Sequence, residues 1–168
     1  MQLVRPSSRY RESFVAAIDE FQAEALPWWA GPAIDLARSD FDAFVAMKLA
    51  EAETGTASGP AKTHLWAVDD DVFVGRIAIF HELTQELSRS GGHIGYDTRP
   101  MFRRRGLATQ MLRQALPVAR ELGLERVLLT CDRSNFASIR VIQRNGGIQD
   151  RRHATPGSKI AFWISLKP

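Results

Sequence analysis

The amino-acid sequence predicts an α/β fold of the α+β kind, with a mixed β-sheet flanked by four helices in one domain over residues 1–168. Its length of 168 residues is typical of one domain. Apolar residues make up 45% and charged residues 24%, as in ordinary globular proteins. Segments with helical spacing of apolar residues and strand-like segments follow one another in the order β-α-α-β-β-β-α-β-α-β-β.

The first half of the chain predicts a strand, two helices and a hairpin. The strand falls at 3–4, and apolar residues at helical spacing predict the first helix over 10–24. Proline, glycine and tryptophan at 27–32 predict a loop, and a capping Ser or Asp begins the second helix over 39–53. Two strand patterns around an aspartate turn predict an antiparallel hairpin over 64–80.

The second half predicts strands and helices in alternation. A strand over 93–98 precedes a helix over 106–122, and an apolar strand over 127–131 precedes a helix over 135–145. A closing hairpin is predicted over 148–166, around a turn at 155–158. Helices that follow strands imply parallel pairing, whereas the earlier hairpin is antiparallel, so we expect a mixed sheet.

The charge pattern favours a small anionic ligand. The net charge is only +3, but arginines cluster at 103–105 and 151–152. A mild excess gathered in clusters fits a small anion better than a long polyanion, and a solvated surface is the alternative. The sequence has no recognition-helix motif, zinc ligands or aromatic stacking platform, so we expect no nucleic-acid partner.

Location is predicted from what the sequence lacks. The lone Cys131 has no partner for an internal disulfide, which fits a reducing compartment. The N-terminal segment has no apolar core of a secretory signal, and no apolar run approaches the roughly 18 residues of a spanning helix. We therefore expect a cytoplasmic protein with no membrane partner.

One strand-loop-helix junction carries the chemical signal. A strand is predicted to end near Thr98, Pro100 forces a turn, and a helix begins near Gly106. The first amides of a helix have no partners within it and hold anions. Glycine admits a phosphate close to the backbone, and the arginines of 103–105 add forked donors. The junction predicts a pyrophosphate site; the alternative is an ordinary helix start with surface arginines.

Those residues also resemble a known family. The pattern Arg103-x-x-Gly106-x-Ala108 is similar to the Arg/Gln-x-x-Gly-x-Gly/Ala signature of the GNAT superfamily of N-acetyltransferases. The preceding 98–100 and the following 122–147 resemble the family's strand end, next strand and next helix, and the element order matches over nearly the whole chain. His93 to Tyr96 and 130–132 are similar to a poorly characterised acetyltransferase subgroup.

The resemblance implies an acetyl-CoA-dependent N-acetyltransferase without a metal. Acetyl-CoA would enter between splayed parallel strands four and five, and a bulge at Gly95 would turn an N–H toward the thioester carbonyl. A primary amine of a small molecule or peptide would attack directly. The implied cofactor residues are Tyr96, Thr98, Arg103, Arg104, Arg105, Gly106, Leu107, Ala108, Thr109 and Asn135.

The candidate bases lie near the fourth strand. His93 has a suitable ordinary pKa, and its alternative role is a histidine satisfied within the sheet. Glu82 and His81 follow the third strand and could equally be solvated loop residues. Asp97 is a candidate that would act through water.

The candidate acids are fewer. Ile142 stands where many family members carry a tyrosine, so the usual proton donor is missing. Ser138, one turn earlier, could bond the sulfur or simply cap the helix, and Tyr96 is a more remote option. Cys131 is expected to be a small buried hydrophobe. The missing tyrosine leaves a CoA-binding module without turnover as an alternative function.

The remaining candidates also have two roles each. Asn135 would bond the pantetheine amide or cap the helix, which need the same residue type. Trp28 and Trp29 lie where the resemblance puts the acceptor, and core anchoring is the alternative. We expect one of the pair to be exposed. Related folds often form dimers, so a homodimer stays an open alternative.

Overall fold

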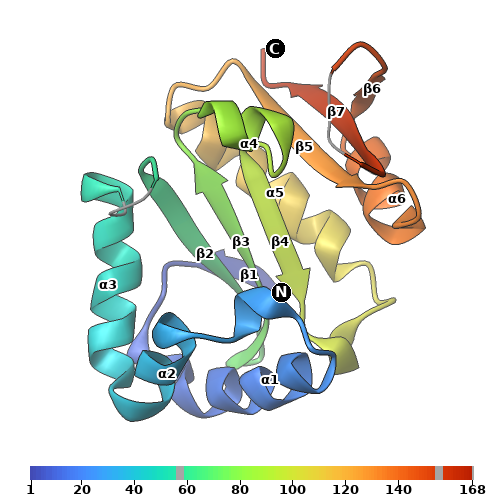
Figure 1. Cartoon of the computed structure of the whole chain (residues 1–168). Coiled ribbons are helices and arrows are strands. Elements are labelled where there is room, and N and C mark those ends of the chain that lie inside the picture. Colours follow the sequence, from blue (N-terminus) through green and yellow to red (C-terminus); the bar gives the residue numbers. More distant parts are fainter. Residues whose placement is uncertain (56–58, 154–156, 168) are drawn as a thin grey trace.

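A computed structural model describes residues 1–55, 59–153 and 157–167 of the chain (Figure 1). Its first half contains β1 (Gln2–Val4), α1 (Arg11–Ala23), α2 (Pro32–Ser39), α3 (Phe41–Thr54), β2 (Lys62–Asp69) and β3 (Val72–Phe80). Its second half contains α4 (Gln85–Arg89), β4 (Ile94–Thr98), α5 (Leu107–Glu121), β5 (Arg126–Asp132), α6 (Phe136–Arg144), β6 (Ile148–Asp150) and β7 (Lys159–Ser165).

The strands form two sheets that diverge from each other. One sheet has the order β1-β2-β3-β4 and the other β5-β7-β6. Figure 1 shows β4 and β5, the facing edge strands, pointing the same way and splaying apart, as the family resemblance implies. Every ladder in the described ranges is antiparallel, so the parallel pairing expected in the second half is replaced by pairing of β5 with β7.

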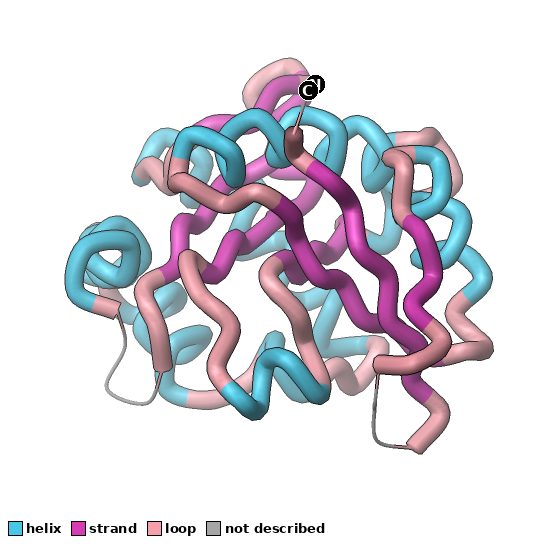
Figure 2. Tube along the Cα trace, turned by 90° about the horizontal axis from the view of Figure 1, so that it is seen from above, coloured by secondary structure: helices cyan, strands magenta, loops and turns pink. Residues whose placement is uncertain are grey.

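Two layers of helices bury the two faces of the larger sheet. Helix α5 packs behind β3 and β4 and centres one core cluster, which includes Met111 and Leu129. Helices α1, α2 and α3 cover the opposite face around a cluster of aromatic side chains that includes Phe14 and Trp66. The view in Figure 2 shows the strands running between these helical layers. Within the described residues, no helix is long and apolar enough to cross a membrane.

The described part of the chain contains six α-helices, which corrects the predicted four. Helix α2 follows a stretch whose Gly and Pro residues predict a loop. Gly31 adopts a φ of 87° before the helix, and Pro32 occupies the first helical position, so these residues form a helix start. Helix α4 is a short turn of helix whose Thr84 side chain accepts a bond from the Leu87 amide. The hairpin of β2 and β3 and the closing hairpin of β6 and β7 both form as predicted, although the turn at 155–158 falls partly outside the described residues.

Candidate active site

The cleft between the two sheets closes at His93. The His93 carbonyl accepts the Phe80 amide of β3 at 2.7 Å, while the His93 amide donates to the Leu128 carbonyl of β5 at 2.7 Å. The ring Nδ1 of His93 also accepts the Leu128 amide at 2.8 Å. One residue therefore joins the two sheets, and β4 and β5 separate immediately beyond it.

The cleft-facing edge of β4 offers free backbone groups. Just before β4, the His93 carbonyl accepts a hydrogen bond from β3. Just after β4, the Arg99 amide donates to the Val74 carbonyl of β3. Such bonds alternate along an antiparallel pair, so the N–H and C=O of Ile94 and Tyr96 face the cleft. The register with β3 is continuous, which corrects the bulge expected at Gly95. The cleft-facing donor beside Gly95 is the amide of Tyr96.

The loop before α5 carries a run of free amides. In the described part of the chain, the backbone N–H groups of residues 104–109 donate to no acceptor. Arg104 has a φ of 62° and Gly106 a φ of 77°, and such turns gather successive amides into an anion-binding concavity. A Cβ added at Gly106 would meet nothing within 4 Å, so the approach to these amides is open. The α5 dipole adds positive potential at the same point.

The three arginines of this loop have different surroundings. Arg103 makes two bonds to the Glu24 carboxylate, at 2.6 and 2.7 Å, and a third from Nε to the Thr98 carbonyl at 3.1 Å. Its side chain therefore ties the loop to the end of α1, and its expected contact with the cofactor stays a prediction. Arg105 lies over the Phe102 ring at 5.2 Å, and the side chains of Arg104 and Arg105 are exposed.

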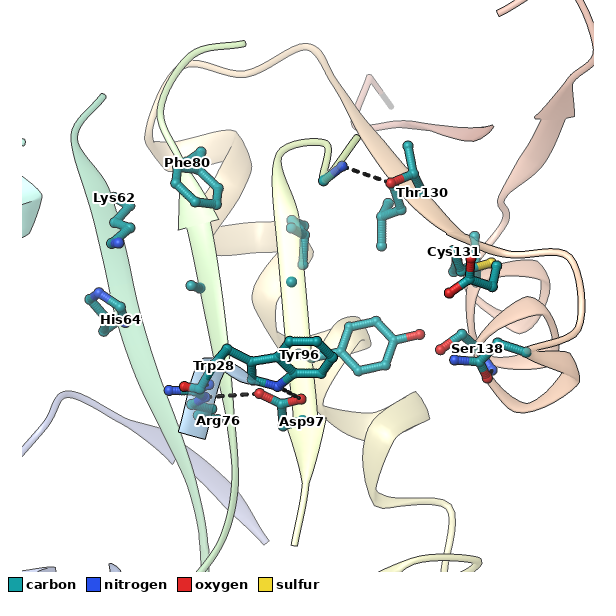
Figure 3. A pocket seen from close by; sticks show the side chains of 18 of the residues that line it. Trp28, Lys62, His64, Arg76, Phe80, Tyr96, Asp97, Thr130, Cys131 and Ser138 are labelled. Carbon is teal, nitrogen blue, oxygen red and sulfur yellow. Dashed lines mark hydrogen bonds and ion pairs between the residues drawn. The ribbon is translucent and has the colours of Figure 1, made fainter. Parts of the chain in front are cut away.

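A cavity of about 560 Å³ runs from this cleft across the face of the larger sheet. Its cleft half is lined by β4, β5 and α6, including Tyr96, Asn135 and Ser138. Its other half is lined by α2, α3, β2 and β3, and Figure 3 shows Trp28 in front of these strands, next to Asp97. The two halves meet at Gly95, where a Cβ would meet nothing within 4 Å.

The cleft half gathers hydroxyl groups. Figure 3 shows the Tyr96 ring pointing from β4 toward Ser138 on α6. The Tyr96 hydroxyl is buried and has no hydrogen-bond partner in the described structure. Burial raises the pKa of Tyr96 to about 12. Ile142 is buried beside them, so the tyrosine that many family members carry there is replaced by a hydrocarbon side chain.

Three further residues of the cleft region differ in their surroundings. The Asn135 side chain accepts the Ser138 amide at 3.0 Å, so it caps α6 while it also lines the cavity. Cys131 is buried, and burial, with the neighbouring Asp132, raises the pKa of its thiol. The thiol therefore stays protonated, as expected of a small buried side chain. Thr98 has a buried hydroxyl without a partner in the described ranges.

The other half of the cavity is a trough across the sheet. Gly95 of β4 pairs with Ala78 of β3, which pairs with His64 of β2, so the three lie in one row on one face. Small side chains at Gly95 and Ala78 make the trough floor. Neighbouring strands lie about 4.8 Å apart, so His64 is about 10 Å from Gly95 along the trough.

One wall of the trough is an ion pair that the Trp28 indole joins through a hydrogen bond. Asp97 receives a bond from Arg76 Nε at 2.9 Å and another from Trp28 Nε1 at 3.0 Å. Figure 3 shows these three side chains together beside Tyr96. Asp97 is the carboxylate nearest to Gly95 along β4, on the same face of the sheet.

The far end of the trough holds a cluster that the sequence pattern does not predict. Glu51 of α3 bonds to Lys48 at 2.8 Å, Lys62 at 3.0 Å and His64 at 2.7 Å. Lys62 and His64 are two residues apart on one strand, and Lys48 and Glu51 are three apart on one helix. Those spacings put each pair on one face and were the available signal. Nothing local indicated that the two faces would meet.

Three residues that the sequence predicts as candidate bases do not line the cavity. The His93 ring accepts the Leu128 amide in the sheet junction, and burial, with the charge of Arg126, lowers its pKa to about 4. It is not among the cavity-lining residues, so we do not retain it as a base. Glu82 is exposed beyond β3, outside that lining, and His81 bonds Thr63 at 2.9 Å. Both belong to the loop surface.

The two neighbouring tryptophans have opposite positions. Trp28 is 55% exposed and lines the cavity, whereas Trp29 is fully buried and stacks on Phe21 with ring centroids 4.0 Å apart. Trp29 is thus a core anchor, which corrects its expected substrate contact.

In the part of the chain that the structure describes, no three His, Cys, Asp or Glu side chains gather to hold a metal.

Known structures share this fold at low sequence identity. Microcin C7 self immunity acetyltransferase MccE, solved with acetyl-CoA and AMP, is 13% identical with a TM-score of 0.69, over 97% of this chain and 91% of that one. RimJ of Mycobacterium smegmatis, solved with CoA-disulfide, is 19% identical with a TM-score of 0.69, over 97% and 80%. The protein yncA of Salmonella typhimurium, described as a putative acetyltransferase and solved with acetyl-CoA, is 16% identical with a TM-score of 0.61, over 98% of this chain and 94% of that one.

Sequence comparison gives the family. No curated protein matches the chain at a significant level. The family model for the acetyltransferase (GNAT) domain matches residues 3–148, which is most of the chain and includes the cleft and the loop before α5. The free amides of that loop and the splayed edge strands agree with the match. The chain therefore belongs to the GNAT acetyltransferase family.

Proposed function

We propose that the protein transfers an acetyl group from acetyl-CoA to a primary amine of a small-molecule or peptide acceptor. The observation that carries this proposal is the single cavity in which the cleft edge of β4 and the trough meet at Gly95. Acetyl-CoA supplies an acetyl thioester, which the amine attacks directly. Acetyl-CoA in the similar MccE and yncA structures supports the choice of donor.

Several unpartnered groups fit the donor. The pyrophosphate would accept bonds from the amides of residues 104–109, with the exposed Arg104 and Arg105 adding charge. The pantetheine arm would lie along the free edge of β4, near Thr98 and the Asn135 side chain. Leu107, Ala108 and Thr109 contribute through their backbone amides at the helix start.

The cleft hydroxyls supply the proton donor in this proposal. Tyr96 stays protonated at neutral pH because its pKa is about 12, so its hydroxyl can donate to the departing sulfur. Ser138 lies beside it and would hold the same sulfur or orient the Tyr96 hydroxyl. Ile142 leaves no donor at the position where many family members have one.

Asp97 is the proposed proton acceptor. It is the carboxylate beside Gly95 on the trough face, and its bonds to Arg76 and Trp28 fix its orientation. A water between Asp97 and the incoming ammonium group would carry the proton. Trp28 lies over the same point and would contact the acceptor.

Thiol release from acetyl-CoA, measured over a panel of amines, amino acids and peptides, tests the proposal. We expect release above the hydrolysis background with at least one acceptor, inhibited by excess free CoA. Asp97→Asn should lower the rate while acetyl-CoA affinity is retained. Saturable acetyl-CoA binding without release for any acceptor would contradict the enzyme and leave the CoA-binding module.

A further inference from the structure

Two lysines share one carboxylate at the far end of the trough. Lys48 contacts Oε1 of Glu51, and Lys62 and His64 both contact its Oε2. Burial opposes ionisation of Glu51, but bonds from His64 and Lys48 outweigh it and hold the pKa of Glu51 well below its usual range. Glu51 is thus a full negative charge, and it can balance only one of the two lysines.

The cluster therefore carries an excess positive charge in a largely buried place. The side chains of Lys48, Lys62 and Glu51 are only 14%, 21% and 9% exposed. Burial lowers the pKa of His64, so at neutral pH it adds no charge of its own. Burying an uncompensated charge costs free energy. Burial likewise lowers the pKa of Lys48, although Glu51 opposes that shift. An added anion would balance the excess charge and would also raise the pKa of Lys48.

The positive side of the cluster faces the cavity. Lys48, Lys62 and His64 line it, whereas Glu51 lies behind them, outside that lining. The ammonium groups are held over aromatic rings, with Lys48 at 5.7 Å from the Phe44 centroid and Lys62 at 5.5 Å from the Phe80 centroid. Figure 3 shows Lys62 and His64 side by side on β2. The other charges of the trough, Arg76 and Asp97, already pair with each other.

We propose that Lys48 and Lys62 bind an anionic group of the acceptor, so that the substrate is an amine that also carries a carboxylate or a phosphate. This rests on the proposed acetyl transfer and names its substrate class. The amine would lie over Gly95 and the anionic group near His64. The two points are about 10 Å apart along the sheet, and the lysine side chains shorten that span. An extended amino acid or aminoalkyl phosphate fits these limits.

The first test compares acceptors that differ in one group. Thiol release is measured with aminohexanoate, hexylamine and hexanediamine, and with the shorter members of each series down to four carbons. We expect the best amino acid of the series to exceed its uncharged and dicationic counterparts by about tenfold or more in kcat/KM. Aminoalkyl phosphates of the same lengths separate the two anion chemistries. Equal or better use of the alkylamines or diamines would overturn the proposal.

Variants then assign the effect to the cluster. Lys48→Met and Lys62→Met should lower kcat/KM for the amino acid about tenfold and leave that for hexylamine nearly unchanged. Lys167→Met, which removes an exposed lysine paired with Glu125, is the matched control. An equal loss with all three acceptor types would mean a structural cluster and would overturn the proposal.

Binding without turnover separates this proposal from the proposed function. Aminohexanoate is titrated calorimetrically into the protein saturated with free CoA, where no acetyl group is available. Affinity that falls about tenfold in each lysine variant, but not in Lys167→Met, supports the anion site even if no acceptor releases thiol. Thiol release from plain amines, combined with no aminohexanoate binding at all, retains the enzyme and rejects the anion site.

Discussion

The backbone of Leu128 is held by His93 at both its N–H and its carbonyl group. Its amide donates to the His93 ring and its carbonyl accepts from the His93 backbone. A ring nitrogen that accepts an amide bond must lack a proton, so a protonated His93 would break this contact. The junction where β4 and β5 part is therefore built on a neutral, buried histidine.

The first prediction concerns acid stability. Because the pKa of His93 is about 4 in the folded protein and about 6.5 when unfolded, the unfolded state binds the extra proton first as pH falls. The free energy of unfolding should thus decrease between pH 6.5 and 4, by about 1–3 kcal/mol from this residue. In His93→Asn the amide oxygen can replace Nδ1 as acceptor, so urea titrations should show a smaller decrease across that range.

The same variant separates structure from catalysis. If His93 serves only the junction, the pH profile of kcat/KM in His93→Asn should keep the shape of the parent profile. Disappearance of an acid-side limb near the ordinary histidine pKa, at unchanged stability, would instead restore His93 as the base.

His93 also shows how far the sequence determined the fold. The helical and strand periods predicted both hairpins and four of the six helices, because those patterns are local, whereas the splayed strands were implied by the family resemblance alone. Pairing of β5 with β7 depends on contacts between distant segments, so alternation of strands and helices suggested parallel pairing instead. Helix α2 was missed because Gly31 and Pro32 have loop preferences that also suit a helix start.

In the site, too, features that are contiguous in the sequence were predictable and features that depend on distant contacts were not. The junction at Gly106 was predictable because its chemistry is contiguous, from the arginines to the helix start. The role of Arg103 was not, because its partner Glu24 lies at the end of another helix. The trough was beyond sequence reasoning for the same reason: Lys48 and His64 meet only when α3 packs on β2.

A glycine pair at the two ends of α5 tests the anion site. Gly106 and Gly123 both have positive φ, at 77° and 87°, and open space at the Cβ position. Gly106→Ala and Gly123→Ala should therefore cost similar stability, about 1–2 kcal/mol each. Only Gly106→Ala should weaken acetyl-CoA binding, because only its methyl group lies beside the free amides. Equal affinities in the two variants would argue against the phosphate assignment.

The arginines give a separate test by their different partners. Because the Arg103–Glu24 pair is half exposed, a double-mutant cycle with Arg103→Gln and Glu24→Gln should give a coupling of about 0.5–1 kcal/mol in stability. Arg104→Gln should leave stability nearly unchanged and lower acetyl-CoA affinity, with a weaker dependence on salt. A larger affinity loss from Arg103→Gln than from Arg104→Gln would reverse these assignments.

The neighbouring tryptophans predict opposite phenotypes. Trp29→Ala removes a fully buried ring stacked on Phe21 and should cost about 3–5 kcal/mol in the free energy of unfolding. Trp28→Ala removes a half-exposed ring over the trough, so it should change stability little and raise KM for the acceptor. Thermal unfolding and steady-state thiol release check the pair, and a Trp28 variant with parental KM would remove that residue from the acceptor site.

The last prediction isolates the proton donor. Tyr96→Phe deletes a buried hydroxyl that has no partner in the described structure, so stability should be unchanged or slightly higher. The rate of thiol release should nevertheless fall about 100-fold in kcat, because a donor to the leaving sulfur is lost. Tyr10→Phe, at the chain's other tyrosine, is the matched control and should retain full activity.

The pH dependence sharpens this test. A hydroxyl with a pKa of about 12 is protonated throughout the usual assay range, so Tyr96 should cause no loss of rate as pH rises from 7 to about 10. Ser138→Ala should reduce kcat less than Tyr96→Phe does if Ser138 only orients the phenol. If Ser138→Ala is instead the more damaging variant and Tyr96→Phe retains parental kcat, the serine is the donor, and the unpaired phenol of Tyr96 only fills the floor of the cleft.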